Sequence, residues 1–311
     1  MASVFVIERE EVESLGKKTR LTTLQLLASL VPQAKSKARP PVSNYRVGAV
    51  GLGASGRIFF GVNLEFPGLP LSQSVHAEQF LVANAALHGE SALTHIAVST
   101  TPCGHCRQFL QEIRSAPEIS VLVTGDGDTD GSAHPDPGPD DFRRIAFFLP
   151  HRFGPRDLLH GDVPLLLENR NNRLAIASSA ADSLPVEDRD LLHSALRAAN
   201  RSHAPYSGCP SAVALRAKGG RVFAGSYIES AAHNPGLHPI QAALVAFVAG
   251  GGGGYEEIER AVLVERKGAV VAQEGVVRLV LASVAPTCSF SVVHCQPQIS
   301  VDGDGDALNH N

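Results

Sequence analysis

Residues 41–65 read PVSNYRVGAVGLGASGRIFFGVNLE, and residues 205–229 read PYSGCPSAVALRAKGGRVFAGSYIE. A shift of 164 positions lays the second stretch on the first without a gap, so that Glu65 falls on Glu229. Each stretch has two short apolar runs around a glycine-containing turn, which is typical of a β-hairpin. The identical positions in the first copy are Pro41, Ser43, Gly56, Arg57, Phe59, Gly61 and Glu65.

The same order of elements continues beyond the hairpin. Residues 75–87 have the apolar spacing of a helix, and a strand pattern at 95–99 brings Ala97-Val98 onto Ala261-Val262. These matches predict an α/β unit built twice, each copy a mixed sheet with helices on its faces, by duplication rather than as a solenoid. The predicted boundaries are an N-terminal helical segment (1–40), a first domain (41–155), a linker (156–185), a second domain (186–295) and a disordered tail (296–311).

Proline and glycine indicate where one helix ends and where one turn lies. Residues 21–31 predict a helix in the N-terminal segment, and Pro40-Pro41 should end it because proline lacks an amide hydrogen. The run GLGASG at residues 51–56 matches the glycine pattern of dinucleotide-binding loops. That interpretation requires a helix to follow, whereas the strand pattern RIFFGV follows here. We therefore expect a hairpin turn and no dinucleotide.

Composition excludes several classes of protein. The chain has 311 residues, of which 44% are hydrophobic and 19% are charged, as in a globular protein. Five cysteines, an odd number, favour a reducing compartment over a disulfide scaffold. Apolar runs stay short of the ~18 residues that a membrane span needs, and four glutamates among the first thirteen residues fit no targeting peptide. We expect a cytoplasmic protein, neither secreted nor membrane-bound.

The net charge of −4 is unevenly distributed. Residues 124–141 hold six aspartates and no lysine or arginine, and residues 296–311 hold three more aspartates. Without these nine charges the remainder of the chain carries +5, yet it has no clustered basic stripe of the kind that binds nucleic acid. We expect an acidic surface loop at 124–141 and no nucleic-acid partner.

Two short motifs carry the chemistry. His76-Ala77-Glu78 opens one predicted helix, and the run Pro102-Cys103-Gly104-His105-Cys106 opens another. Two thiols at a helix start can face one point, where the helix amides favour thiolate. A histidine adds a third ligand, and zinc with three protein ligands keeps a fourth position open, as catalytic sites require.

The spacing of His76 and Glu78 restricts where the metal can lie. Residues two apart point about 200° apart on a helix, so both approach one ion only if it lies off the N-terminal end. Glu78 is then expected beside the metal rather than on it. Two alternatives stay open: a redox pair of the two cysteines, and a structural zinc with His105 or another histidine as fourth ligand. The joint pattern H-x-E…P-C-x-x-C is the signature of zinc-dependent base deaminases.

Several longer runs resemble the cytidine deaminases of the long, two-domain type: GVNLEF, VHAEQ, TPCGHCRQFL, HRFGP and AANRSHAPYS. The resemblance implies their three-layer α/β fold, a zinc ion on His76, Cys103 and Cys106, and Glu78 as the proton shuttle. It also implies that five residues bind the nucleoside: Asn63 and Glu65 at the ribose 3′-hydroxyl, and Tyr45, Ala77 and Phe153 near the base. For Tyr45 and Phe153, plain core packing is the alternative.

The activity that this resemblance implies is hydrolytic deamination of cytidine and 2′-deoxycytidine to the uridine forms and ammonia, in pyrimidine salvage. Activated water would attack C4, and Glu78 would carry its proton to N3 and assist departure of ammonia. The resemblance further implies a homodimer whose second domain helps to close the partner's active site. The alternatives are a polynucleotide cytosine deaminase, which needs a basic, aromatic-lined channel, and a non-enzymatic zinc-binding interaction protein.

The second copy lacks these functional residues. The shift of 164 carries His76 to Ile240, Glu78 to Ala242, Cys103 to Lys267 and Cys106 to Val270. We therefore expect a second domain with a retained fold and no catalysis. Cys209, Cys288 and Cys295 have no ligand spacing and are expected to be buried free thiols.

Overall fold

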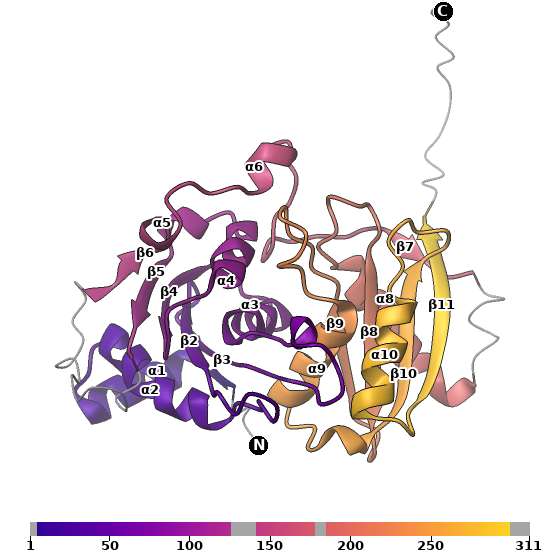
Figure 1. The fold of residues 1–311 in the computed structure, drawn as a ribbon, viewed down its shortest axis with the longest axis horizontal. Coiled ribbons are helices and arrows are strands. Elements are labelled where there is room, and N and C mark those ends of the chain that lie inside the picture. Colours follow the sequence, from indigo (N-terminus) through magenta and orange to yellow (C-terminus); the bar gives the residue numbers. More distant parts are fainter. Residues whose placement is uncertain (1–4, 126–140, 178–184, 299–311) are drawn as a thin grey trace, which may run out of the picture.

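Two β-sheets form the centres of two domains in the computed structural model, which describes residues 5–125, 141–177 and 185–298 (Figure 1). The first sheet has the order β1-β3-β2-β4-β5-β6, and the second has the order β7-β11-β10-β8-β9. The β4–β5 and β10–β11 pairs are parallel and the other pairs are antiparallel. The strands are β1 Val6–Ile7, β2 Gly48–Gly53, β3 Ile58–Val62, β4 Leu93–Val98, β5 Ser120–Val123, β6 Arg143–Arg144, β7 Leu174–Ala175, β8 Ser211–Ala217, β9 Val222–Ser226, β10 Ile258–Arg266 and β11 Ser289–Pro297.

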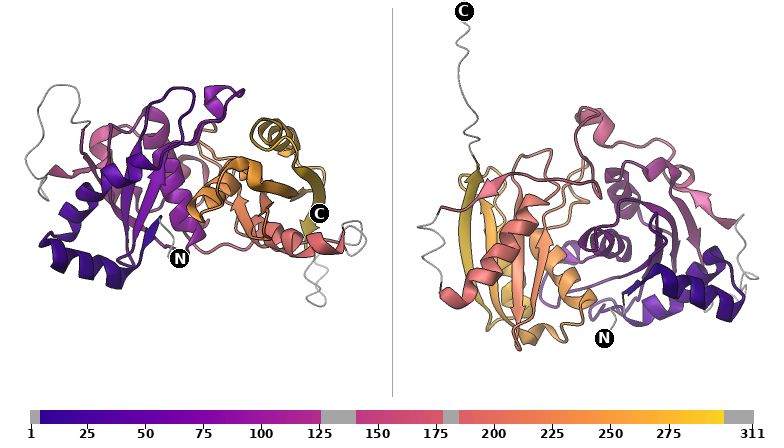
Figure 2. Two further views of the ribbon diagram at one scale, coloured as in Figure 1. Left: turned by 90° about the horizontal axis from the view of Figure 1, so that it is seen from below. Right: turned by 180° about the vertical axis from the view of Figure 1, so that it is seen from behind.

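Helices cover both faces of each sheet, so the expected duplicated α/β fold with mixed sheets is confirmed. In the first domain α2 packs on β2 and α3 packs on the opposite face; α8 and α9 take these places in the second domain (Figure 2). No helix in the described ranges is long and apolar enough to cross a bilayer. The helices are α1 Arg9–Thr19, α2 Thr23–Ser36, α3 Ala77–Leu87, α4 Gly104–Phe109, α5 Ile145–Phe148, α6 Pro155–Leu158, α8 Arg189–Asn200, α9 Pro239–Ala249 and α10 Glu274–Val284.

The two hairpins have the same register. Leu52 pairs with Ile58 in the first domain, and Arg216, 164 positions later, pairs with Val222. The GLGASG run thus ends β2 and begins the turn to β3, and the hairpin prediction is confirmed. Glycine is required at position 61 because a Cβ there would lie 2.1 Å from the carbonyl oxygen of Ala77, and Gly225 meets the backbone of α9 in the same way.

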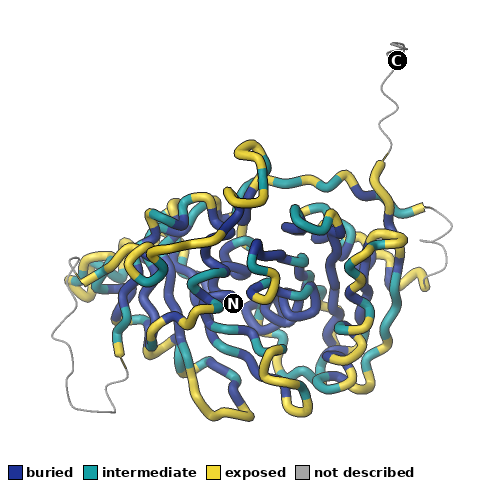
Figure 3. Tube along the Cα trace, turned by 45° about the horizontal axis from the view of Figure 1, so that its top comes forward, coloured by how far each residue is buried: buried dark blue, intermediate teal, exposed yellow. Residues whose placement is uncertain are grey.

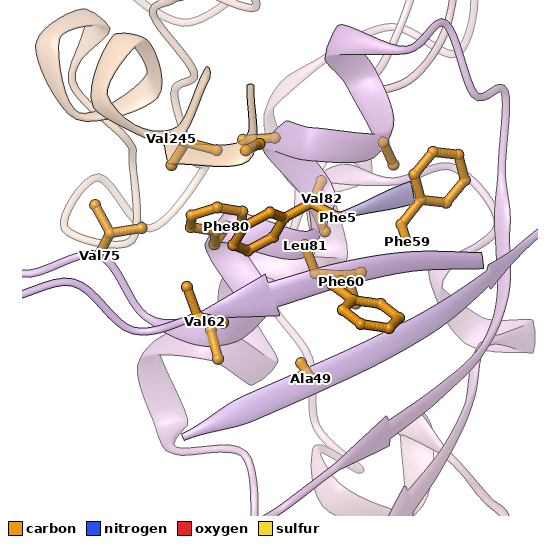
Figure 4. Close-up of a cluster of buried hydrophobic side chains, with 14 of the residues drawn as sticks. Phe5, Ala49, Phe59, Phe60, Val62, Val75, Phe80, Leu81, Val82 and Val245 are labelled. Atoms are coloured by element: carbon orange, nitrogen blue, oxygen red, sulfur yellow. The ribbon is translucent and has the colours of Figure 1, made fainter. Parts of the chain in front are cut away.

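The helices α3 and α9 pack against each other between the sheets. Every residue of α9 is buried, and so are the first nine residues of α3, because each helix lies against both its own sheet and the other domain (Figure 3). Helices that are apolar all round belong in such places. Figure 4 shows Val245 of α9 beside the cluster in which Phe5 stacks on Phe80 with ring centroids 5.2 Å apart.

The N-terminal segment differs from its predicted form. The helix predicted at 21–31 is α2, which begins after the Thr22 capping box, continues through Pro32 and ends at Ser36, before Pro40-Pro41. A second helix, α1, and a short strand, β1, precede it. Within this segment β1 pairs with β3, and α2 packs on β2.

The predicted linker and tail also contribute to the second sheet. Residues 174–175 of the linker form β7, which pairs with Gln296 and Pro297 at the end of β11. Two residues assigned to the tail are therefore part of a strand. Most of the acidic stretch, 126–140, and the end of the tail, 299–311, lie outside the described residues.

Candidate metal and active site

The starts of α3 and α4 converge on one point. His76 is the N-cap of α3 and Cys103 is the N-cap of α4, so both side chains extend from helix N-terminal ends. The Nδ1 atom of His76 lies 3.5 Å from Sγ of Cys103 and 3.4 Å from Sγ of Cys106. These three are the group of histidine, cysteine and carboxylate residues, among those the structure describes, that could hold a metal ion.

The separations fit zinc. With ordinary zinc–nitrogen and zinc–sulfur bonds, a tetrahedral ion places the nitrogen and sulfur atoms about 3.6 Å apart. The observed 3.4 and 3.5 Å agree with that value. The three side chains come from two helix ends, as the sequence predicts, and among the described residues no fourth histidine, cysteine or carboxylate belongs to this group.

Glu78 lies beside this group in the first turn of α3. Its side chain is buried, with 4% of the residue exposed, and its Oε2 atom accepts a hydrogen bond of 3.2 Å from the Cys106 thiol. Burial raises the pKa of Glu78 above the usual value for a glutamate. A buried carboxyl group with a raised pKa beside this group is suited to act both as a base and as an acid.

The two thiols have opposite tendencies. The neighbouring Cys106 side chain, together with His76 and the Cys106 backbone amide, lowers the pKa of Cys103 to about 3. The neighbouring Cys103 side chain, added to burial, raises the pKa of Cys106. One thiolate therefore forms readily, and the second proton leaves when a cation binds, because ligands bind in their deprotonated form.

His105 does not complete a closed cage. Its ring stacks on that of His76, with centroids 4.9 Å apart and an interplanar angle of 13°. A ring parallel to His76 lies beside the ligand imidazole, and within the described residues His105 is not part of the group that could hold a metal. Its Nε2 atom is buried without a hydrogen-bond partner. This geometry favours an open site over the structural-zinc alternative.

The residues predicted near the base differ in burial. Tyr45 is 50% exposed and Phe153 is 44% exposed, so neither is packed in the core of this chain. The carbonyl oxygen of Phe153 accepts a hydrogen bond from Gln108 of α4, which ties its loop to the cysteine-bearing helix. Ala77 is buried as the first residue of α3.

The predicted ribose residues shape the loop before β2. Asn63 accepts a hydrogen bond from the Val47 amide at 2.8 Å and donates one to the Tyr45 carbonyl at 2.9 Å. Glu65 accepts hydrogen bonds from the amides of Val42 and Ser43 and from the Ser43 hydroxyl. Burial works against these bonds, but together they lower the pKa of Glu65, which is therefore ionised at neutral pH.

Glu229 has the same three donors in the second domain: the amides of Tyr206 and Ser207, and the Ser207 hydroxyl. A glutamate at this position thus holds the loop even where the functional residues are missing. A carboxylate offers about four acceptor positions, so one remains on Glu65 for a further donor.

The chain resembles known proteins in both of its domains. Two segments, residues 21–123 and 145–278, match the family described as the cytidine and deoxycytidylate deaminase zinc-binding region. Cytidine deaminase 1 of Arabidopsis thaliana is 55% identical over 296 residues, covering 94% of this chain and 97% of the relative. The chain belongs to the cytidine deaminase family.

A second plant relative also matches most of the chain. Cytidine deaminase 6 of Arabidopsis thaliana is 50% identical over 279 residues, which cover 86% of this chain and 91% of that protein. The match to the crystal structure of cytidine deaminase from Mycobacterium tuberculosis has 27% sequence identity and a TM-score of 0.35. It covers 43% of this chain and 98% of the Mycobacterium chain. Zinc as the cofactor is supported by the family match together with the His76, Cys103 and Cys106 group.

The second domain of this deaminase-family chain corrects one prediction. The N-cap of α9 is His238, and its capping box with Gln241 repeats that of His76 with Gln79. The ungapped shift misplaced these residues because the chain from Glu65 to His76 is two residues longer than the chain from Glu229 to His238. His76 therefore corresponds to His238, not Ile240.

The remaining ligands are replaced. Counting from the helix starts, Ile240 stands at the position of Glu78, Gln273 at that of Cys103 and Val276 at that of Cys106. The Nδ1 atom of His238 lies 2.9 Å from Oε1 of Gln273, where His76 has a thiol sulfur. At the positions that correspond to His76, Cys103, Cys106 and Glu78, the second domain thus keeps the histidine but has neither a cysteine nor a glutamate. Of the three other cysteines, all free, Cys209 and Cys295 are buried and Cys288 is partly exposed.

Two buried polar residues near the site escaped the motif analysis. Gln79 caps α3 at its Oε1 atom, and Glu112 follows α4 in a 3-10 turn, Leu110–Glu112. Gln79 could have been found from the repeat, since HAEQ and HPIQ share histidine and glutamine at the same spacing. Glu112 has no such signal, because its partners lie about 90 to 120 residues away.

Proposed function

We propose that this protein catalyses zinc-dependent hydrolytic deamination of cytidine and 2′-deoxycytidine to uridine and 2′-deoxyuridine, with release of ammonia. The observation that supports this most is the open His76, Cys103 and Cys106 group with buried Glu78 beside it, in a chain of the cytidine deaminase family. The reaction belongs to pyrimidine salvage, and we propose a cytoplasmic location.

The chain's own residues provide the proton transfers. Zinc on the three ligands supplies Lewis acidity, which makes water a nucleophile near neutral pH. Glu78 is the base that takes the proton of the attacking water and the acid that delivers it to ring N3. It then takes the second proton, from the hydroxyl group now on C4, and delivers it to the departing amino group, so that the C4 carbonyl forms as ammonia leaves. One carboxyl group with a raised pKa therefore serves both directions of transfer.

Separate groups of residues bind the base and the ribose of the nucleoside. We assign Tyr45, Ala77 and Phe153 to the base, and Asn63 and Glu65 to the ribose. The free acceptor position on ionised Glu65 suits the 3′-hydroxyl, and a carboxylate there would repel a 3′-phosphate. A free nucleoside is therefore favoured over a polynucleotide.

A homodimer completes this proposal. Tyr45 and Phe153 are about half exposed in the single chain, although binding of a pyrimidine ring requires an environment from which water is excluded. A second copy whose second domain covers these two side chains would provide that environment. Sedimentation should give a dimer, and a fully active monomer would contradict the arrangement.

The proposed activity is tested by ammonia release from the purified protein. We expect release from cytidine and 2′-deoxycytidine, loss of release after chelation, and recovery when zinc is added back. A single-stranded cytosine-containing oligonucleotide should give little or none. Release from the oligonucleotide alone would favour the polynucleotide deaminase, and zinc content without any release would favour a binding protein.

Glu65→Gln tests the ribose contact against a matched control. Loss of a hydrogen bond to a charged group costs about 1.5–3 kcal/mol, so kcat/KM for cytidine should fall about 10- to 100-fold. Glu229→Gln removes the carboxylate charge from the three corresponding donors in the second domain and should leave kcat/KM unchanged. With 3′-deoxycytidine, wild type and Glu65→Gln should differ little; an equal loss on both substrates would assign Glu65 to loop structure alone.

A further inference from the structure

The two domains exchange a reciprocal pair of hydrogen bonds. The Nε2 atom of Gln79 donates to the carbonyl oxygen of Pro235 at 3.0 Å, and Nε2 of Gln241 donates to the carbonyl oxygen of Gln73 at 2.7 Å. Both glutamines are almost completely buried, with 1% and 3% of the residue exposed. Each domain thus fixes the first turn of its central helix on the loop that precedes the other domain's central helix.

The Gln79 side chain also holds the backbone of a zinc ligand. Its Oε1 atom accepts the His76 amide hydrogen at 3.1 Å. One planar amide group therefore connects His76 to Pro235, so the position of the His76 backbone is set partly by the second domain. Such supporting contacts commonly orient metal ligands.

Glu112 makes the equivalent connection for the cysteine-bearing helix. It is fully buried, and Oε2 accepts hydrogen bonds from Nε2 of His203 at 3.1 Å and from the Tyr206 hydroxyl at 2.7 Å. Its Oε1 atom accepts the Ala231 amide at 2.7 Å. Arg170 donates to Nδ1 of His203, which leaves the Nε2 hydrogen for Glu112. All three donors to this carboxylate belong to the second domain.

A single segment of the second domain joins these two connections. Ala231 and Pro235 lie in the loop between β9 and α9, and this segment, 231–235, bonds to Glu112 through its first residue and to Gln79 through its last. Glu112 follows α4, which carries two ligands, and Gln79 lies in α3, which carries the third. The segment therefore spans the two helices whose spacing determines the geometry of the zinc ligands.

We propose that segment 231–235 of the non-catalytic second domain is a positioning element for the zinc site, acting through Gln79 and Glu112. This inference rests on the proposed function only in taking the metal to be zinc. It gives the second domain a role within its own chain, separate from any contact with a partner copy. Gln79 is a positioning residue, since it reaches the ligand through the His76 backbone.

The reciprocal bond provides a matched control. Gln79→Met and Gln241→Met each remove one buried amide of the same kind, at the same helix position and across the same interface. Gln79 bonds to the amide of the ligand His76, whereas Gln241 bonds to the amide of His238 and reaches the first domain only at the Gln73 carbonyl, three residues before His76. Both variants should therefore lower the thermal unfolding midpoint of the zinc-free protein to a similar extent.

The decisive measurement is the rate at which a chelator removes zinc from each purified holoenzyme. We expect Gln79→Met to lose zinc about 10-fold or more faster than Gln241→Met, since loss of outer contacts commonly weakens metal binding 10- to 100-fold. Tyr206→Phe, which removes one donor to Glu112, should also release zinc faster than Gln241→Met, and it decides the matter if Gln79→Met does not fold. Equal release rates in all three variants would overturn the proposal. A wild type that holds zinc without deaminating cytidine would refute the proposed function and leave this inference standing.

Discussion

Glu78→Gln should leave the zinc in place and lower kcat for cytidine by a factor of about 10³ to 10⁴, at the upper end of the range for a general acid–base residue. We expect this large effect because the same carboxyl group transfers protons at three points: from water, to N3 and to the leaving amine. Glutamine has nearly the same shape but can neither accept nor release a proton at these pH values. Zinc content by metal analysis and kcat by ammonia release are the two measurements.

The zinc is expected to stay because Glu78 is outside the ligand group. Its Oε2 atom contacts the Cys106 thiol, whereas the ligand atoms belong to His76, Cys103 and Cys106. Glu265→Gln is a suitable control, since Glu265 is equally buried at 4% exposure and lies in the second domain. It should lose stability without losing turnover. Loss of zinc in Glu78→Gln would instead assign Glu78 to the metal, and unchanged turnover would remove its role as proton shuttle.

Local patterns allowed the sequence to predict much of the first domain. The β2–β3 hairpin, α3 and the helix start at Cys103 each follow from apolar spacing, glycine or a short motif within a few residues. The position of Glu78 beside the ligand group rather than within it also follows from helix geometry alone. These features depend on neighbours in the chain, which is what a sequence displays directly.

The features that escaped prediction depend on distant partners. The strand β1 forms by pairing with the edge of β3, and β7 forms by pairing with the edge of β11. These two-residue strands, in the N-terminal segment and the linker, therefore cannot be predicted from their own residues. The correspondence of His76 with His238 was hidden because the two β-to-helix loops differ by two residues, which an ungapped shift cannot accommodate. Glu112 and Gln79 have partners in the other domain; the repeated H-x-x-Q spacing indicates Gln79, whereas no local pattern indicates Glu112.

His76→Ala and His238→Ala should separate the two domains by their metal content. The wild-type chain should hold one zinc ion, since the described residues contain one group able to bind it. Removing His76 takes away the nitrogen ligand and leaves two thiols, so we expect zinc affinity to fall by more than about 100-fold, a larger loss than for outer contacts. Turnover of cytidine should disappear with the metal, as measured by metal analysis and ammonia release on the same preparation.

His238→Ala removes the corresponding histidine and should leave zinc content and kcat unchanged. The Nδ1 atom of His238 is paired with the side-chain oxygen of Gln273, and its ring lies parallel to that of Tyr227 with centroids 6.4 Å apart. An amide oxygen and a valine in place of two thiolates cannot form a site of comparable affinity, because zinc in mixed sites of this kind depends on its sulfur ligands. The two variants change the same residue type at the same helix position, so a general effect on folding would appear in both. If His238→Ala lost its zinc while His76→Ala kept it, the assignment of the catalytic centre to the first domain would be wrong.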